Sequence, residues 1–304
     1  FAERSVGKFA KTDGQTAAKI TSIGVIGGGT MGSGIALTSA LSKIRCTVVD
    51  INASQLDKAK SYHAKQLQKS VDKKRLTQAE AEACENLLSY TDDIARVSSA
   101  DWAIEAATEN IDVKKKLFVM MDNVFRDNVV LATNTSSISI TELASAISDS
   151  SHRVIGMHFF NPVPVMKLVE VIKGDATDDC TTQSTLELAT ALGKTPVLAN
   201  DFAGFVSNRV LMPMINEAFH AWSDGVAEPE AIDSIMQLGC AFPMGPLRLA
   251  DYIGLDVCCD IMMVMYNGLQ KDAKYLPNKK LIELVEAGRL GDKSGEGVYN
   301  YGQE

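Results

Sequence analysis

The segment ITSIGVIGGGTMGSGIALTSAL, residues 20–41, decides the fold of this chain. Residues 20–26 are a short apolar run that predicts a buried strand, and the residues after the glycines have the pattern of a helix packed on a sheet. Between the two, Gly27, Gly29 and Gly32 have the G-x-G-x-x-G spacing. In such a loop the first glycine allows a tight turn, the second lets a pyrophosphate approach, and the third lets the helix pack closely on the strand. The spacing therefore predicts a dinucleotide-binding loop at a helix N-terminus.

An acidic residue after the next predicted strand indicates which dinucleotide binds. Residues 46–49 form a second apolar run, and Asp50 follows it directly. A carboxylate about 20 residues beyond the glycine loop is where the adenosine ribose is usually bound. Because an acid at this place repels a 2′-phosphate, we expect NAD rather than NADP.

The chain continues in the pattern of a Rossmann-type, doubly wound and mostly parallel sheet, which is an α/β fold. Residues 102–107 and 129–133 are predicted strands, with a predicted helix over 111–125 between them. Open parallel sheets bind ligands beyond the carboxyl ends of their strands. Glu109 and the run Asn134-Thr-Ser-Ser are therefore expected on the cofactor side.

The serine-rich run also has a purely structural interpretation as a helix cap. Ser137 or Ser139 could cap the helix that begins near residue 139, and Glu142 would complete a capping box for the latter. Either choice leaves Ser136 for a ligand.

Two regions are expected to be helical. Residues 54–88 predict an inserted pair of helices joined near Leu76-Thr77, with a basic cluster that is either a solvated helix face or a landing site for a phosphate-bearing substrate. The members of this cluster are Lys65, Lys69, Lys73, Lys74 and Arg75. We expect a NAD-binding domain over 20–200, followed by an all-α substrate and dimerisation domain over 201–304.

The second half predicts a small set of helices. Their expected ranges are 203–223 with a kink or break at Pro213, 229–238, 246–269, and 278–287. Residues 261–265, Ile-Met-Met-Val-Met, are apolar on all sides and are either core or a surface for a partner. So much apolar surface in a small helical domain favours a symmetric dimer.

Composition excludes several classes of function. The chain has 304 residues, 46% of them hydrophobic, and a formal net charge of −8. An acidic chain repels phosphate backbones, so nucleic acid is not an expected partner. No apolar run is long enough for a membrane span. The six cysteines form no C-x-x-C pair and indicate free thiols in a reducing compartment, and we expect no metal site. Residues 1–19 lack the apolar region of a secretory signal and fit either the remnant of a processed leader or a boundary.

The stretch MHFFNPVPVMKLVEV, residues 157–171, places two titratable side chains in apolar surroundings. The flanking runs 153–158 and 167–172 predict two strands, separated by an extended Asn161-Pro-Val-Pro segment. If the strands pair, Glu170 can hold one imidazole nitrogen of His158 and make the other nitrogen a general base. The alternative is a core histidine satisfied by backbone, with Glu170 at a strand edge.

Six motifs together resemble the short-chain L-3-hydroxyacyl-CoA dehydrogenases of the mitochondrial type, over about residues 20–302. They are Gly27-x-Gly29-x-x-Gly32, Asn134-Thr-Ser-Ser, His158-Phe-Phe-Asn-Pro-Val-Pro-Val-Met-Lys-Leu-Val-Glu170, Gly204-Phe-Val-Ser-Asn208-Arg, Phe242-Pro-Met-Gly-Pro and Lys293-Ser-Gly-Glu-Gly-Val-Tyr. The histidine-to-glutamate motif is much more specific than the glycine motif. The resemblance implies NAD-dependent oxidation of (S)-3-hydroxyacyl-CoA to 3-oxoacyl-CoA in fatty-acid β-oxidation.

The resemblance also implies roles for individual residues. His158 would take the proton of the 3-hydroxyl, Glu170 would stabilise the imidazolium, and Ser136 and Asn208 would contact the substrate. The implied cofactor contacts are Gly27, Gly29, Gly32, Asp50, Glu109, Lys114, Asn161 and Lys293. Lys73 falls on a position that contacts coenzyme A, whereas Gln66 replaces a serine of the family pattern.

Other readings are kept open. L-gulonate 3-dehydrogenase, with its lens-crystallin relatives, shares the fold and the His–Glu pair, and a non-catalytic NAD-binding structural protein is an alternative of another class. The resemblance implies a homodimer and the mitochondrial matrix, with a bacterial cytoplasm as the alternative. The length of the acyl chain is not predicted.

Overall fold

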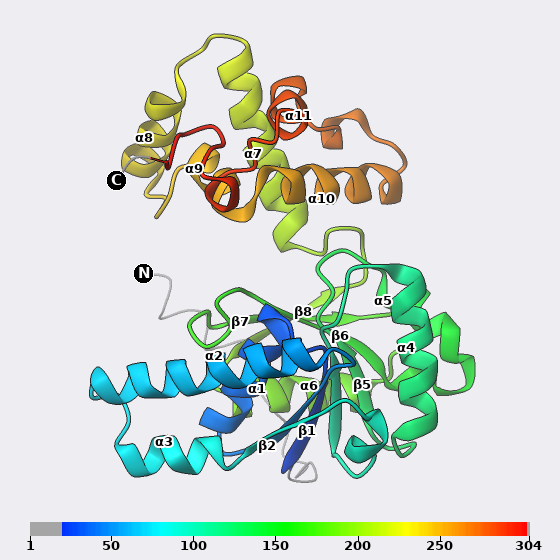
Figure 1. The fold of residues 1–304 in the computed structure, drawn as a ribbon. Helices are drawn as coiled ribbons and strands as arrows, with labels where there is room; N and C mark the ends of the chain where they lie inside the picture. The colour runs from blue at the N-terminus through cyan, green and yellow to red at the C-terminus, as the bar shows by residue number, and fades with distance from the viewer. Residues whose placement is uncertain (1–19, 303–304) are drawn as a thin grey trace. The chain divides into compact units, whose positions relative to one another are not determined.

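The structure, a computed structural model, describes residues 20–302 and divides into two compact units whose sequence boundary lies between Asp201 and Phe202 (Figure 1). The prediction of a processed leader falls in residues 1–19 and lies outside the described residues. Over residues 20–302, no helix combines the length and the apolar character needed to span a membrane. The six cysteines are free thiols.

The first unit is built on one sheet of eight strands in the order β3-β2-β1-β4-β5-β6-β7-β8. The strands are β1 Ser22–Ile26, β2 Arg45–Val49, β3 Leu88–Thr91, β4 Trp102–Glu105, β5 Val130–Thr133, β6 Val154–Phe159, β7 Leu168–Lys173 and β8 Thr195–Asn200. All neighbouring pairs are parallel except β6 and β7, which are antiparallel. The predicted Rossmann-type, mostly parallel sheet is therefore confirmed.

The helices of the first unit cover this sheet and form the predicted insert. They are α1 Thr30–Leu41, α2 Ala53–Asp72, α3 Gln78–Glu85, α4 Ile111–Val124, α5 Ile140–Ala144 and α6 Asp179–Ala191. Figure 1 shows α2 and α3 side by side as a helical hairpin, inserted between β2 and β3. The side chain of Asn52 caps α2, and a capping box of Thr77 and Glu80 starts α3.

Strand β3 was not predicted, and residue 88 belongs to it rather than to the insert. Its sequence Leu-Ser-Tyr-Thr is short and only weakly apolar, and it lies at the edge of the sheet against β2. Pairing with a neighbouring strand, which single-sequence patterns do not reveal, makes this segment a strand. The predicted cap at Ser139 is present, because its hydroxyl accepts from the N–H of Glu142 at 3.1 Å. The Glu142 side chain instead pairs with Lys115.

The second unit, within residues 202–302, contains the α-helices of the C-terminal half. They are α7 Ser207–Ser223, α8 Pro229–Cys240, α9 Pro246–Ile253, α10 Leu255–Gly268 and α11 Lys279–Glu286. Three predictions need correction. The first helix begins at Ser207 rather than 203, because Gly204 and Phe205 take left-handed backbone (φ 79° and 49°). It is one continuous helix through Pro213, so of the two expected outcomes, a kink or a break, the break is absent. The range 246–269 is two helices separated at Gly254, whose φ is 106°.

The apolar segment 261–265 belongs to the core on one side of α10 and is exposed on the other, and its role as a surface for a partner stays a prediction. Met262 and Met265 are buried in the core of the second unit, together with Ile215, Phe219 and Leu247. Their neighbours in α10, which are Met263 and Val264, are more than one-third exposed. A helix that is apolar all round therefore buries one side and presents the other.

Two buried aspartates that were not among the predicted functional residues hold segments of the second unit together. Asp233 accepts the N–H groups of Leu247 and Arg248 at 2.9 and 2.8 Å, which caps the start of α9. Asp251 accepts the N–H groups of Val298 and Tyr299 at 2.9 Å each. Buried carboxylates with several donors are strongly held, so both aspartates have a structural explanation.

Candidate active site

The glycine loop has the shape that a dinucleotide pyrophosphate requires. Gly27 has a φ of +111°, and a Cβ there would lie 2.6 Å from the carbonyl oxygen of Ala106. A Cβ on Gly32 would overlap the carbonyl oxygen of Gly27. Around Gly29, in contrast, a Cβ would meet nothing within 4 Å, and this residue precedes α1 without a side-chain cap. The loop is thus tight where it turns and open where α1 presents its N-terminal N–H groups, which fits a bound pyrophosphate.

Asp50 lies next to this loop at the carboxyl end of β2. Its Oδ2 accepts the N–H of Gly28 at 2.8 Å, and its Oδ1 accepts the N–H of Asn52 at 2.9 Å. Both oxygens are therefore oriented by backbone, and the side chain remains partly accessible. This arrangement suits a carboxylate that accepts hydrogen bonds from ribose hydroxyls.

The strand register brings His158 and Glu170 directly opposite each other on β6 and β7. The Nδ1 of His158 is 2.8 Å from the Oε2 of Glu170, and the two side chains are 9% and 5% exposed. A carboxylate accepts only, so Nδ1 carries the proton in this contact and Nε2 is left as the basic nitrogen. The ring of Phe160 packs against the imidazole with centroids 4.6 Å apart. Sequence reasoning left open whether these strands pair, and the structure brings the two residues together.

The loop after His158 is held by a lysine that is absent from the predicted residues. Asn161, which is exposed, precedes Pro162 through a cis peptide bond. Lys194 is only 8% exposed, and its ammonium donates to the carbonyl oxygens of Val163 and Met166. Burial lowers the pKa of Lys194. A buried ammonium needs hydrogen-bond acceptors, and here they are carbonyl oxygens of the loop that follows Asn161. Lys194 therefore holds this loop in place. A lysine after a glycine turn carries no sequence signal for this role.

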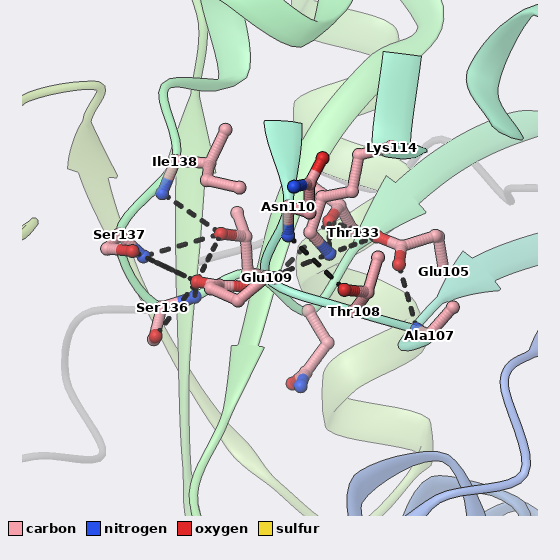
Figure 2. A network of polar contacts seen from close by, with 12 residues as sticks. Glu105, Ala107, Thr108, Glu109, Asn110, Lys114, Thr133, Ser136, Ser137 and Ile138 are labelled. Carbon is pink, nitrogen blue, oxygen red and sulfur yellow. Dashed lines mark hydrogen bonds and ion pairs between the residues drawn. The ribbon is translucent and has the colours of Figure 1, made fainter. Parts of the chain in front are cut away.

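Glu109 gathers the serine-rich run at the end of β5, as Figure 2 shows. Its Oε1 accepts the hydroxyl of Thr135 at 2.7 Å, and the N–H and hydroxyl of Ser136 at 2.8 and 3.0 Å. It also accepts the N–H and hydroxyl of Ser137 at 3.1 and 3.0 Å. Glu109 and Ser136, both predicted at this edge of the sheet, are therefore in direct contact.

Lys114 lies deeper in the same network, in the first turn of α4. Its Nζ is 2.5 Å from Oε2 of Glu105 and 3.7 Å from Oε2 of Glu109. Glu105 is completely buried and is absent from the residues predicted from sequence. Its signal is the same as for Glu170, namely a carboxylate inside an apolar strand, Trp-Ala-Ile-Glu.

Three further predicted residues, Asn208, Lys293 and Lys73, are described within their own elements. Asn208 is buried in α7 and Lys293 is exposed and pairs with Asp256 at 2.6 Å, both within the second unit. Lys73 is exposed at the C-terminal end of α2, and Gln66 is half-buried on the same helix. The basic cluster continues on this helix with Lys65 and Lys69, both exposed.

Comparisons with known proteins identify the family to which this fold belongs. Residues 22–202 match the NAD-binding domain of 3-hydroxyacyl-CoA dehydrogenase, and residues 204–301 match its C-terminal domain. A probable 3-hydroxybutyryl-CoA dehydrogenase of Bacillus subtilis is 48% identical over 93% of this chain and 98% of its own length. The human mitochondrial hydroxyacyl-coenzyme A dehydrogenase is 40% identical over 91% of this chain and 90% of its own.

A solved structure gives the same result. The (S)-3-hydroxybutyryl-CoA dehydrogenase of Ralstonia eutropha has a TM-score of 0.91 and 44% identity, and the match covers 94% of this chain and all of that one. The glycine loop fits the cofactor of this family, which is NAD. The chain therefore belongs to the 3-hydroxyacyl-CoA dehydrogenase family of NAD-dependent oxidoreductases.

Proposed function

We propose that this protein oxidises (S)-3-hydroxyacyl-CoA to 3-oxoacyl-CoA with the His158–Glu170 pair as general base. The observation that carries the proposal is the 2.8 Å contact between Nδ1 of His158 and Oε2 of Glu170. Both side chains are nearly buried. A base must present the correct tautomer, and this contact leaves Nε2 as the proton acceptor.

The reaction divides between the chain and its cofactor. NAD, when bound by the glycine loop and Asp50, would supply the acceptor for the hydride from C3 of the substrate. His158 takes the proton of the 3-hydroxyl through Nε2 and becomes an imidazolium. Glu170 stabilises that imidazolium and keeps the ring from rotating. In the reverse direction, His158 returns the proton to the oxygen of the 3-oxo group.

Two further side chains complete the proposed substrate site. Ser136 contacts the reacting oxygen, and its main chain is fixed through the N–H that donates to Glu109. Asn208, from α7, positions the acyl-CoA. The cofactor contacts are Gly27, Gly29, Gly32, Asp50, Glu109, Lys114, Asn161 and Lys293.

The substrate class follows from the relatives and from the charge of the insert. Two of the relatives named above are 3-hydroxybutyryl-CoA dehydrogenases, so we propose short 3-hydroxyacyl-CoA thioesters and a place in fatty-acid β-oxidation. The exposed Lys73 meets the phosphates of coenzyme A, since a lysine on a solvated helix is suited to a phosphate.

One assay tests the proposed function. NADH oxidation is followed at 340 nm with acetoacetyl-CoA as substrate, and dehydrogulonate is the competing substrate. We expect turnover with acetoacetyl-CoA and at most a trace with dehydrogulonate. Turnover only with dehydrogulonate would establish a gulonate dehydrogenase, and NADH binding without turnover of either would establish a non-catalytic NAD-binding protein.

We also propose a homodimer formed through the second unit. Val210 on α7 is 67% exposed, and Ile235 and Leu238 on α8 are 61% and 88% exposed. Exposed apolar side chains on neighbouring helices are typical of a surface for a partner. Light scattering after gel filtration should give twice the mass of one chain, and Leu238→Glu should reduce it to one.

The compartment stays a prediction. The relatives include bacterial proteins and a human protein whose name states that it is mitochondrial. The matrix and the bacterial cytoplasm are both reducing compartments, which suits the free cysteines. Imaging of the tagged gene product in its source cells distinguishes them.

A further inference from the structure

We infer that Glu105 is a positioning residue, which holds Lys114 and thereby keeps Glu109 on the serine donors that fix Ser136. No part of the proposed reaction uses Glu105, although it is a completely buried carboxylate at the ligand end of β4. The inference rests on the proposed function, because only there does Ser136 contact the reacting oxygen.

The first step is the competition for Lys114. One ammonium lies between two carboxylates, 2.5 Å from Oε2 of Glu105 and 3.7 Å from Oε2 of Glu109. The side chains of Lys114 and Glu105 are 2% and 0% exposed, whereas that of Glu109 is 43% exposed. An unpaired charge is far more costly in the interior than at the surface. Lys114 therefore stays with Glu105, and the Glu109 carboxylate remains available to accept hydrogen bonds from the serine run.

The second step is the way in which Glu105 joins two strand ends. Its Oε1 accepts the N–H of Ala107 at 2.8 Å, and its Oε2 accepts the hydroxyl of Thr133 at 2.7 Å. The same hydroxyl oxygen accepts the N–H of Thr135 at 3.2 Å. Glu105 thus connects the end of β4 to the end of β5, from which Glu109 and Ser136 follow.

The third step is that Glu109 holds the serine run through hydrogen bonds. A single oxygen, Oε1, accepts five donors from Thr135, Ser136 and Ser137, two of which are main-chain N–H groups. These N–H groups fix the backbone of Ser136 and hence the place of its Oγ, while the hydroxyl proton can still rotate toward a substrate oxygen.

Neutralising Glu105 should therefore misplace Ser136. With glutamine at position 105, the Lys114 ammonium retains Glu109 as its only carboxylate within 4 Å among the described residues. Closing the 3.7 Å gap would turn the Glu109 carboxylate away from the serine donors. The acceptor that holds Ser136 would then be lost, although neither Glu109 nor Ser136 had been changed.

The test compares three variants in the acetoacetyl-CoA assay at saturating NADH. We expect Glu105→Gln to lower kcat on the order of 10²-fold, as small misplacements in active sites do, and to lower NADH affinity less than kcat. The matched control is Glu142→Gln, which removes the surface acid paired with the neighbouring Lys115 and should leave kcat unchanged. NADH affinity is measured by fluorescence titration, and folding by thermal unfolding.

The decisive variant is the double replacement Glu105→Gln with Lys114→Gln. Because Lys114 is also a proposed cofactor contact, this variant is assayed at an NADH concentration that its own titration shows to be saturating. It buries no charge and leaves no ammonium to draw Glu109 off the serines, so its kcat should exceed that of Glu105→Gln by roughly tenfold. A double variant no faster than the single one overturns the inference. So does a folded Glu105→Gln protein with the kcat of the wild type and only a lower Tm, which would indicate a structural role.

A milder variant keeps the test decisive if Glu105→Gln does not fold. Glu105→Asp retains the charge but withdraws the carboxylate from Lys114 by one methylene. Its kcat should therefore lie between that of the wild type and that of Glu105→Gln. A wild-type kcat in folded Glu105→Asp counts against the inference. If the wild-type protein itself does not reduce acetoacetyl-CoA, the proposed function fails, and the inference fails with it.

Discussion

His158 and Glu170 face each other across two adjacent antiparallel strands, with Nδ1 2.8 Å from Oε2. The contact explains how an apolar run can bury both side chains, because each supplies the hydrogen-bond partner that the other needs. It also orients the imidazole before any substrate binds. The proposed chemistry depends on this pair, and its two members make distinct predictions.

Replacing His158 by glutamine should lower kcat by about 10²–10⁴-fold, the usual contribution of a general base. The glycine loop and Asp50 are unchanged, so NADH affinity should remain within about twofold. The assay is acetoacetyl-CoA reduction, with NADH titrated by fluorescence. His152→Gln, at an exposed histidine, is the control and should be fully active. Unchanged turnover in His158→Gln would exclude His158 as the base.

Replacing Glu170 by glutamine should lower kcat less, by roughly 10- to 100-fold, which corresponds to one hydrogen bond to a charged group. The amide oxygen can still accept the Nδ1 proton, but it cannot offset the charge of an imidazolium. If the two residues act as a unit, the double variant with His158→Gln should be no slower than His158→Gln alone. Multiplied effects in the double variant would show that Glu170 acts independently of His158.

Local sequence patterns predicted the parallel sheet and its glycine loop. They did not predict strand β3 or the boundary between α9 and α10. The glycine spacing, the apolar runs and Asp50 lie within residues 20–50, so this part of the site could be read from sequence. Strand β3 depends on its pairing with β2. The separation of α9 from α10 depends on the positive φ of Gly254, which an otherwise continuous apolar pattern conceals.

In the candidate site, too, some side-chain partners could be predicted from the sequence and others could not. A carboxylate in an apolar strand is visible at both Glu105 and Glu170, but only the second was matched with a partner. The partner of Glu105 is Lys114, which reaches it from α4. Side-chain direction from a helix onto a neighbouring strand end cannot be read from spacing alone. The same holds for Lys194, whose carbonyl partners lie across the loop after His158.

Replacing Asp50 by asparagine should weaken NADH binding by about tenfold and reduce the preference for NADH over NADPH. The neutral amide loses the charge-assisted bonds to ribose hydroxyls and no longer repels a 2′-phosphate. Fluorescence titration with both cofactors gives the two Kd values. Asp57→Asn, at an exposed aspartate of α2, is the control. An unchanged ratio of the two Kd values would contradict the assignment of Asp50 to the ribose.

Replacing Lys73 by alanine should raise KM for acetoacetyl-CoA by a few-fold, about 1 kcal/mol or less, because an exposed ion pair contributes little. The effect should shrink as salt is added, since salt screens exposed charges. The control is Lys60→Ala, an exposed lysine on another side of the same helix. Equal KM values for the two variants at low salt would remove Lys73 from the coenzyme A site.

Folding stability should fall as the pH drops below about 6.5, because His63 is buried in a neutral form. The Nε2 of His63 is 2.8 Å from the carbonyl oxygen of Ser33, so it donates there, and Nδ1 accepts from the hydroxyl of Tyr90 at 2.7 Å. Burial lowers the pKa of His63 from its ordinary value of 6.5, although the bond to Ser33 opposes this. Between the folded and unfolded pKa values, the unfolded chain binds more protons, and stability therefore rises with pH in this window.

His63→Gln removes this group and should flatten the dependence of the unfolding free energy on pH between about pH 7 and pH 5, relative to the wild type. Urea unfolding at several pH values measures the slope. His152→Gln, which removes an exposed histidine, should keep the slope of the wild type. The same slope in His63→Gln and His152→Gln would show that the acid sensitivity arises elsewhere. A reduced slope in His63→Gln alone would assign it to the histidine that joins α2 to the first turn of α1, where the cofactor loop ends.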